Sequence, residues 1–246
     1  MRLIQHFISN KSAPGHSKRT GKVYNPATGE QSAEVKLAST KDVNFAIESA
    51  KKAFEPWANT PPLQRARIMF KFKELIEKNS DELTKIIVAE HGKVYEDAKG
   101  SLTRGLEVVE FACGIPQMLK GEFTENVGTD IDSWSTRQPL GVCAGITPFN
   151  FPAMVPMWMF PMAIACGNTF ILKPSEKDPS CAMKLAHLFT EAGLPDGVFN
   201  IVNGDKEVVD AILENKNIPA VSFVGSTPIA KYIYENAAKN KKRVQA

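Results

Sequence analysis

Cysteine is scarce in this sequence, with four residues in 246, and none of the four belongs to a metal-binding pattern. Neither a C-x-x-C pair nor a Cys/His ligand spacing occurs, so we expect no zinc site and no disulfide framework. Three of the four lie in apolar surroundings, which favours buried, reduced thiols. The cysteines are Cys113, Cys143, Cys166 and Cys181. We therefore expect a reducing, cytoplasmic location, with the mitochondrial matrix as the alternative.

A strong net charge is also absent, because 30 basic residues face 27 acidic ones and give +3. The only basic run is 239–243, which disfavours nucleic acid or an anionic membrane surface as a partner. The phosphate-binding patterns G-x-G-x-x-G and G-x-x-x-x-G-K-[ST] are missing as well. Neither the common dinucleotide fingerprint nor a P-loop is therefore expected.

Charge disappears altogether between Arg137 and Lys173. Prolines and glycines interrupt every run of about 20 apolar residues there, so the stretch does not resemble a membrane span. It instead predicts a buried strand at 142–146, a loop at 147–152, a helix at about 153–166 and a strand at 169–172. The interrupting prolines are Pro139, Pro148, Pro152, Pro156 and Pro161.

The two halves of the chain differ in pattern. A turn between two short extended segments is predicted at 24–30, and helices are predicted from the cap at Ser39, over 62–78, from Ser80, and over 96–119. Residues 130–138 are predicted to be an extended strand that joins subunits. After the helix at about 153–166, strands at 169–172, 198–202 and 220–224 alternate with helices at about 179–192, 205–215 and 226–239. This alternation predicts an α/β fold with a doubly wound, Rossmann-like, open parallel sheet.

Asn150 lies in the loop after the first predicted parallel strand, between Pro148 and Pro152. The two prolines restrict the backbone and can hold the amide in one orientation. A fixed amide N–H can stabilise an oxyanion. The alternative is an asparagine that only closes a turn.

Lys173 and Glu176 follow the next predicted strand, and Pro174 prevents that strand from continuing. An ammonium and a carboxylate at a strand end can bind ribose hydroxyls, and the carboxylate would repel a 2′-phosphate, which favours NAD over NADP. The alternative is a solvated ion pair. Gly225 and Ser226 follow another strand and open a helix, where backbone N–H groups favour a phosphate.

Four ordered motifs together resemble the aldehyde dehydrogenase superfamily. They are TPFNFP at 147–152, ILKPSE at 171–176, GLPDGVFN at 193–200 and FVGS at 223–226. The segment PMWMFPMA at 156–163 and RGLE at 104–107 resemble its CoA-acylating, methylmalonate-semialdehyde dehydrogenase branch.

The resemblance implies a role for each matching residue. Asn150 would be the oxyanion donor, and Arg104 would bind the substrate carboxylate, unless it only pairs with Glu107 or Glu110 on a helix surface. The cofactor-binding residues implied are Thr147, Phe149, Lys173, Glu176, Lys177, Gly225 and Ser226. Lys177 stands where this branch often has Arg, so a planar, bidentate contact is not expected there.

The resemblance also implies NAD as cofactor, coenzyme A as co-substrate, and oxidation of malonate or methylmalonate semialdehyde to acetyl-CoA or propionyl-CoA by a homo-oligomer. It covers the amino-terminal half of the family's usual length, so we expect a helical part at 1–129, an oligomerisation arm at 130–140 and an incomplete NAD-binding core at 141–246. No cysteine matches the family nucleophile, and the chain alone is expected to be inactive. The alternatives are a non-catalytic NAD-binding remnant or subunit partner, and a hydrolytic aldehyde dehydrogenase.

Overall fold

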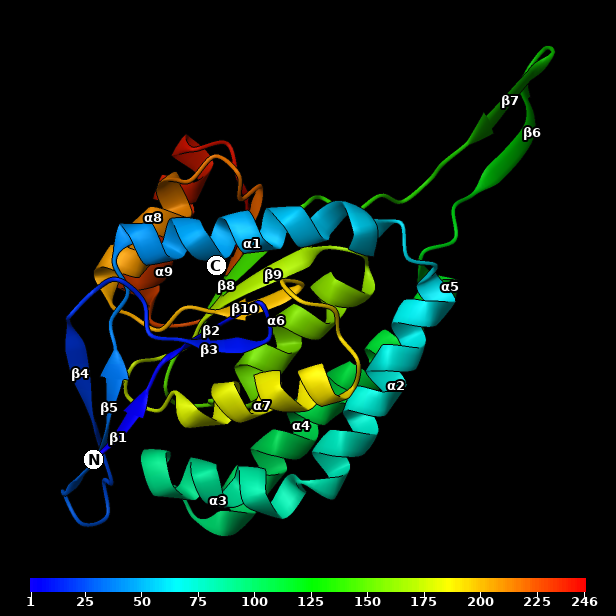
Figure 1. Ribbon diagram of the computed structural model, residues 1–246. Helices are drawn as coiled ribbons and strands as arrows, with labels where there is room; N and C mark the ends of the chain where they lie inside the picture. The colour runs from blue at the N-terminus through cyan, green and yellow to red at the C-terminus, as the bar shows by residue number, and fades with distance from the viewer.

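The fold is built on a seven-stranded sheet with the strand order β12-β11-β8-β9-β10-β2-β3 (Figure 1). The computed structural model describes residues 1–246. Five strands are parallel, in the register Val142↔Thr169 for β8 and β9 and Cys143↔Ala220 for β8 and β11. These strands are β8 (Val142–Ile146), β9 (Thr169–Lys173), β10 (Phe199–Ile201), β11 (Ala220–Phe223) and β12 (Arg243–Gln245). The predicted doubly wound α/β fold is confirmed.

Two antiparallel strands extend this sheet from the beginning of the chain, and the sequence did not predict them. They are β2 (His6–Ile8), which pairs with β10, and β3 (Lys11–Ala13). Residues 1–36 in fact contain five strands, so the expectation of a mainly helical 1–129 was wrong there. Strands of three residues are too short to show an alternating pattern of apolar and polar residues. A separate sheet contains β1 (Arg2–Ile4), β5 (Gln31–Lys36) and β4 (Thr20–Tyr24), with the predicted turn between β4 and β5.

Helices cover both faces of the main sheet (Figure 1). On one face, α1 (Thr40–Ala58), α8 (Lys206–Glu214) and α9 (Thr227–Lys239) enclose an apolar cluster of 20 buried residues. On the other, α2 (Pro62–Lys78), α3 (Ser80–His91), α4 (Tyr95–Cys113), α6 (Met154–Ala165) and α7 (Ser180–Glu191) enclose a cluster of 34. Buried apolar strands between two helical layers are what the uncharged stretch predicted. No helix of the structure combines the length and the apolarity that crossing a bilayer requires.

The helix predicted over 96–119 is divided in the structure. Helix α4 ends at Cys113, and a short helix, α5 (Ile115–Met118), follows Gly114. Gly114 has the lowest helix propensity apart from proline, and Pro116 cannot donate the hydrogen bond that would continue α4.

The extended arm is a hairpin that projects away from the rest of the molecule (Figure 1). It consists of β6 (Phe123–Gly128) and β7 (Ile131–Trp134), which pair only with each other. The predicted strand at 130–138 matches β7, but β6 was missed, and the arm therefore begins earlier than residue 130. The segment Thr124-Glu125-Asn126 offers no alternating pattern, and Asn126 adopts a positive φ of 51°.

Candidate functional site

A cleft of about 640 Å³ lies where the strand order reverses, between the carboxyl ends of β8 and β11. This is the point at which open α/β sheets bind ligands, because the loops from neighbouring strands diverge there. Every residue predicted to bind the cofactor lines this one cleft: Thr147, Phe149, Lys173, Glu176, Lys177, Gly225 and Ser226. The tertiary structure therefore brings together loops that are about 80 residues apart in the chain.

Lys173 and Glu176 form an ion pair at the end of β9, with 3.1 Å between Lys173 Nζ and Glu176 Oε2. The Lys173 side chain is 8% exposed and that of Glu176 is 37% exposed. The pair is therefore anchored by a buried cation and presents its carboxylate to the cleft. Such an arrangement offers one acceptor and one donor to a pair of vicinal hydroxyls.

Ser226 precedes helix α9, and its hydroxyl makes no capping hydrogen bond. The first backbone N–H groups of α9 therefore remain available at the rim of the cleft. Gly225, next to it, has the Phe223 ring so close that a Cβ would lie 2.3 Å from Phe223 Cζ. Glycine is thus required here to let the chain pass over the ring, and the helix end can accept an anion such as a diphosphate.

Thr147 supplies a test of whether a cofactor fits. Its hydroxyl oxygen is buried in the cleft wall and has no hydrogen-bond partner in the protein. A buried polar atom without a partner costs free energy unless a ligand or water satisfies it. Two residues further along the same loop, Phe149 is 48% exposed, and Lys177 Nζ lies over its ring, 4.5 Å from the ring centroid. An unsatisfied hydroxyl, an exposed aromatic ring and a free helix end fit a dinucleotide.

Asn150 and Arg104 line a second, neighbouring depression of about 950 Å³. Asn150 comes from the loop between β8 and α6, and Arg104 comes from the middle of α4. Helices α4 and α6 cross closely because Gly105 of α4 has no side chain: a Cβ there would lie 3.1 Å from Met154 Cα, at the start of α6. Arg104 also pairs with Glu107 at 3.2 Å and is 70% exposed, as the alternative prediction proposed.

Several residues of these two cavities were not predicted. Lys206 and Tyr232 line the cleft from α8 and α9, and Lys93 reaches the depression from the loop after α3. Lys206 pairs with Asp210 at 2.5 Å on its own helix, and only tertiary packing brings that pair to the cleft. No motif marks these lysines in the sequence.

Asp178 is a buried carboxyl that follows Lys177 in the loop between β9 and α7. Burial, and then the nearby Glu90 carboxylate, raise the pKa of Asp178 to about 8. Neither of its oxygens has a hydrogen-bond partner. Asp178 is therefore mostly protonated at neutral pH, and the charge of the loop next to the cleft depends on pH.

The four cysteines are free thiols, as predicted, and three of them are buried. Burial raises the pKa of each, and that of Cys143, which lies within β8, to about 11. A nucleophilic thiol requires a lowered pKa and access to substrate. Cys143 belongs to the buried core, in agreement with the expectation of buried thiols in apolar surroundings.

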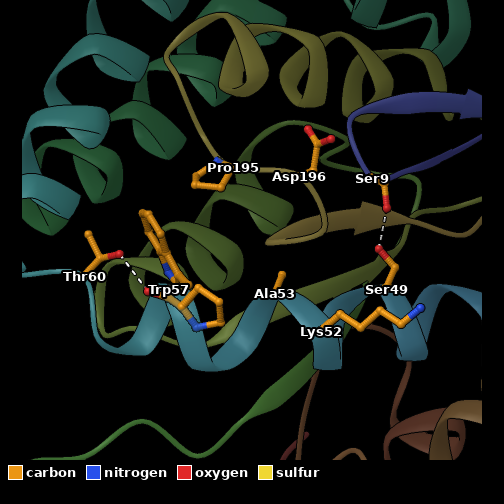
Figure 2. A pocket seen from close by; sticks show the side chains of 9 residues that line it. Ser9, Ser49, Lys52, Ala53, Trp57, Thr60, Pro195 and Asp196 are labelled. Atoms are coloured by element: carbon orange, nitrogen blue, oxygen red, sulfur yellow. Dashed lines mark hydrogen bonds between the residues drawn. The ribbon is translucent and has the colours of Figure 1, made fainter.

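A third cavity, of about 490 Å³, opens at the opposite edge of the main sheet, between the end of α1 and the segment before β10 (Figure 2). Its serine and threonine hydroxyls already have partners within the protein. Ser9 Oγ lies 2.7 Å from Ser49 Oγ, and Thr60 Oγ1 donates to the Pro56 carbonyl at 3.0 Å. The exposed Lys52 and Asp196 form no ion pair there. This cavity offers no buried group for a ligand to satisfy.

Comparison with protein families gives a match over residues 13–246 to the Aldehyde dehydrogenase family. Among curated proteins, malonate-semialdehyde dehydrogenase of Pseudomonas aeruginosa is 56% identical over 241 residues, which are 98% of this chain and 48% of that protein. Malonate-semialdehyde dehydrogenase 3 of Geobacillus kaustophilus is 54% identical over 245 residues, or 100% of this chain and 51% of that protein. The chain thus spans about half the length of the curated relatives it matches.

Solved structures give the same result. A protein of Sinorhizobium meliloti assigned as methylmalonate-semialdehyde dehydrogenase, in complex with NAD, superposes with a TM-score of 0.98 at 57% identity and covers 99% of this chain. Methylmalonate-semialdehyde dehydrogenase of Oceanimonas doudoroffii superposes with a TM-score of 0.97 at 59% identity, also over 99% of this chain. In both cases the match covers 50% of the solved chain.

Proposed function

Because the chain belongs to the aldehyde dehydrogenase family, we propose that it is the amino-terminal, NAD-binding part of an enzyme that oxidises malonate or methylmalonate semialdehyde and transfers the acyl group to coenzyme A. The observation that supports this most directly is the position of Asn150. It lies in the loop that separates the cofactor cleft from the depression containing Arg104. Cofactor, reacting carbonyl and substrate carboxylate would then occupy adjoining spaces.

Asn150 would donate its side-chain N–H to the oxygen of the aldehyde as that oxygen becomes negative. The residue is exposed, and its only hydrogen bond in the structure is made by its backbone carbonyl, so the amide is free for substrate. A donor held in place before the reaction stabilises the developing charge without reorganising.

The cleft residues would hold NAD, which accepts a hydride from the substrate when it is bound. Glu176, anchored by Lys173, would accept hydrogen bonds from the adenosine ribose and repel a 2′-phosphate. The N-terminus of α9, with Ser226 and Gly225, would bind the diphosphate. The solved relative from Sinorhizobium meliloti contains NAD, which supports this choice of cofactor.

Arg104 would bind the carboxylate of the semialdehyde. Its guanidinium projects from α4 into the depression that Asn150 lines, and it can form two parallel hydrogen bonds to a carboxylate. Glu107 would then compete for Arg104 when no substrate is present.

The thiol that attacks the aldehyde would come from the half of the parent enzyme that these residues do not include. Burial raises the pKa of all four cysteines present, so none is suited to be the nucleophile. On this proposal the 246-residue chain alone does not oxidise aldehydes. The competing proposal is a non-catalytic role as an NAD-binding subunit. An assay for NADH formation distinguishes the two proposals.

The hairpin of β6 and β7 would join two subunits. Its large apolar side chains are exposed, with Phe123 at 65% and Trp134 at 70%, and these two residues face each other across the strands. Paired exposed aromatic residues on a projecting hairpin are suited to burial against another chain. We therefore propose a homo-oligomer.

The proposal is tested with the intact protein that includes this chain. Malonate semialdehyde, NAD and coenzyme A should together produce NADH, acetyl-CoA and carbon dioxide, because the carboxylate carbon is lost, and omitting coenzyme A should slow turnover strongly. Equal turnover without coenzyme A would indicate the hydrolytic alternative.

Asn150→Ala in the same protein should lower kcat by about 100- to 1,000-fold, because one oxyanion donor is lost, while the Kd for NAD changes by less than about twofold. Asn44→Ala, an exposed asparagine of α1, is the matched control and should have no effect. Undiminished turnover in Asn150→Ala would show that Asn150 is not the oxyanion donor.

A further inference from the structure

Lys93 contacts two successive residues of the loop that contains Asn150. Its Nζ donates to the backbone carbonyl of Asn150 at 2.9 Å and lies 4.3 Å from the centroid of the Phe151 ring. The lysine has no carboxylate within ion-pair distance, so these are the contacts that its charge makes within the protein.

The segment that positions Lys93 is itself held by packing. Helix α3 ends at His91, and Gly92 turns the chain with a φ of 82°. A Cβ at Gly92 would lie 2.6 Å from the Pro26 side chain, so the turn fits only glycine. The loop after α3 is thus fixed against the amino-terminal turn, and Lys93 approaches Asn150 from a rigid base.

Lys93 contacts the part of the loop at 147–152 whose backbone torsions are least restricted. Pro148 and Pro152 have fixed φ angles, and each restricts the residue before it, Thr147 and Phe151 respectively. Phe149 and Asn150 are therefore the two residues of the loop whose torsions the prolines leave free. Lys177 covers the Phe149 ring from one side, and Lys93 holds the Asn150 carbonyl from the other.

We propose that Lys93 is a positioning residue for aldehyde oxidation: it fixes the peptide plane after Asn150 and so aims the Asn150 side-chain amide at the reacting carbonyl. This inference rests on the proposed function, in which Asn150 is the oxyanion donor. An ammonium is suited to this role because a charge-assisted hydrogen bond to a carbonyl is about twice as strong as a neutral one. Burial lowers the pKa of Lys93, while Asp97 and Asp178 raise it.

A different role for Lys93 must be distinguished. It lines the same depression as Arg104, so it could bind the carboxylate of the substrate instead. The two roles differ in which substrates they affect. A positioning residue acts on every aldehyde, whereas a carboxylate-binding residue acts only on a substrate that has a carboxylate.

The experiment measures kcat and KM of Lys93→Met in the intact protein, with malonate semialdehyde and with uncharged propanal. Positioning predicts that kcat falls at least about tenfold with both aldehydes, which corresponds to losing one charge-assisted hydrogen bond. KM for both, and the Kd for NAD, should stay within about twofold. Lys93→Arg, which keeps a charged donor, should recover most of kcat.

Lys52→Met is the matched control, because Lys52 is an exposed lysine that lines the cavity at the opposite edge of the sheet (Figure 2). It should leave kcat unchanged. If Lys93→Met folds poorly, Lys93→Gln, which retains an uncharged donor, should give a kcat below those of the wild type and of Lys93→Arg with both aldehydes.

Three results would overturn the inference. They are a rise in KM confined to malonate semialdehyde, an unchanged kcat with both aldehydes, and a loss of kcat that is matched by loss of NAD binding and of thermal stability. Asn150→Ala separates this inference from the proposed function. If Asn150→Ala is fully active, the proposed function of Asn150 fails, but if Asn150→Ala is slow and Lys93→Met is not, only the role of Lys93 fails.

Discussion

The two edges of the main sheet each have a cavity, and the cavities differ in the state of their polar atoms. At the edge where the parallel strands end, Thr147 has a buried hydroxyl without a partner, and the hydroxyl of Ser226 leaves the end of α9 uncapped. At the opposite edge, Ser9, Ser49 and Thr60 have all found partners within the protein (Figure 2). Size does not separate the two, at about 640 and 490 Å³.

This difference follows from the direction of the strands. Loops that leave the carboxyl ends of β8 and β11 move to opposite faces of the sheet, so they cannot pair with each other and leave groups free for a ligand. At the amino-terminal edge, the turn between β2 and β3 packs onto α1, and the hydroxyls of Ser9 and Ser49 pair with each other. The unsatisfied groups among the residues that line each cavity, rather than the empty volume, therefore distinguish the candidate site.

The largest expected difference between the two edges is in the Kd for NAD after a larger side chain is introduced at each. Gly225→Val places a side chain against the Phe223 ring and forces one of them into the cleft, so the Kd for NAD should rise about 10- to 100-fold. Ala53→Val adds similar bulk to the cavity at the other edge and should leave the Kd unchanged. Calorimetric titration with NAD measures both, and equal effects would remove the distinction between the two edges.

A smaller difference between the two edges is expected in the preference for NAD over NADP when one carboxylate at each edge is neutralised. Glu176→Gln removes the charge that is proposed to repel a 2′-phosphate, so the preference for NAD over NADP should fall about tenfold. Asp196→Asn, at the opposite edge, should not alter the preference. The ratio of the two Kd values is the measurement. A preference that survives in Glu176→Gln would mean that another residue excludes the phosphate.

The pH dependence of the Tm should differ by a few degrees between carboxylate variants at the two edges. The pKa of Asp178 is raised to about 8 from an ordinary value of 3.8, so the unfolded chain loses this proton at lower pH than the folded protein does. The contribution of the Asp178 proton to the free energy of unfolding is fully present below about pH 4. It falls as the pH rises and is lost above about pH 8. Asp178→Asn resembles the protonated form and should raise the Tm at pH 8 by at least about 2 °C.

The control for this measurement is Asp196→Asn, whose carboxylate is exposed at the other edge. Its Tm should follow that of the wild type at every pH. An Asp178→Asn protein with an unchanged Tm at pH 8 would show that the buried carboxyl is stabilised in its charged form.

The smallest effect is expected for the ion pair on α4. Glu107→Gln releases Arg104 from an exposed pair, which should change the Tm by less than about 1 °C and lower the KM for malonate semialdehyde about twofold. Glu48→Gln breaks a similar exposed pair with Lys51 on α1 and should leave KM unchanged. A higher KM in Glu107→Gln would mean that Glu107 helps to orient Arg104 for the substrate.

The sequence by itself determined the elements whose pattern is local. The uncharged stretch between Arg137 and Lys173 predicted β8, α6 and β9 to within about two residues, because strands buried on both faces must be continuously apolar. Alternation of strands and helices then implied a parallel sheet, and strand ends located the residues that line the cleft and are proposed to bind the cofactor. The local pattern of apolar and polar residues could not reveal β2 and β3. Each strand has only three residues and is stabilised by its pairing in the sheet, β2 with β10 and β3 with β2.

Only the tertiary structure decided what lies around Asn150. Lys93 is 57 residues away in the chain, and the turn at Gly92, the packing of Pro26 and the close crossing of α4 and α6 at Gly105 bring it to the Asn150 carbonyl. The same holds for Asp178, whose raised pKa depends on burial and on Glu90 from helix α3. Sequence periodicity records which face of an element is buried, whereas contacts between distant loops depend on how those faces pack together.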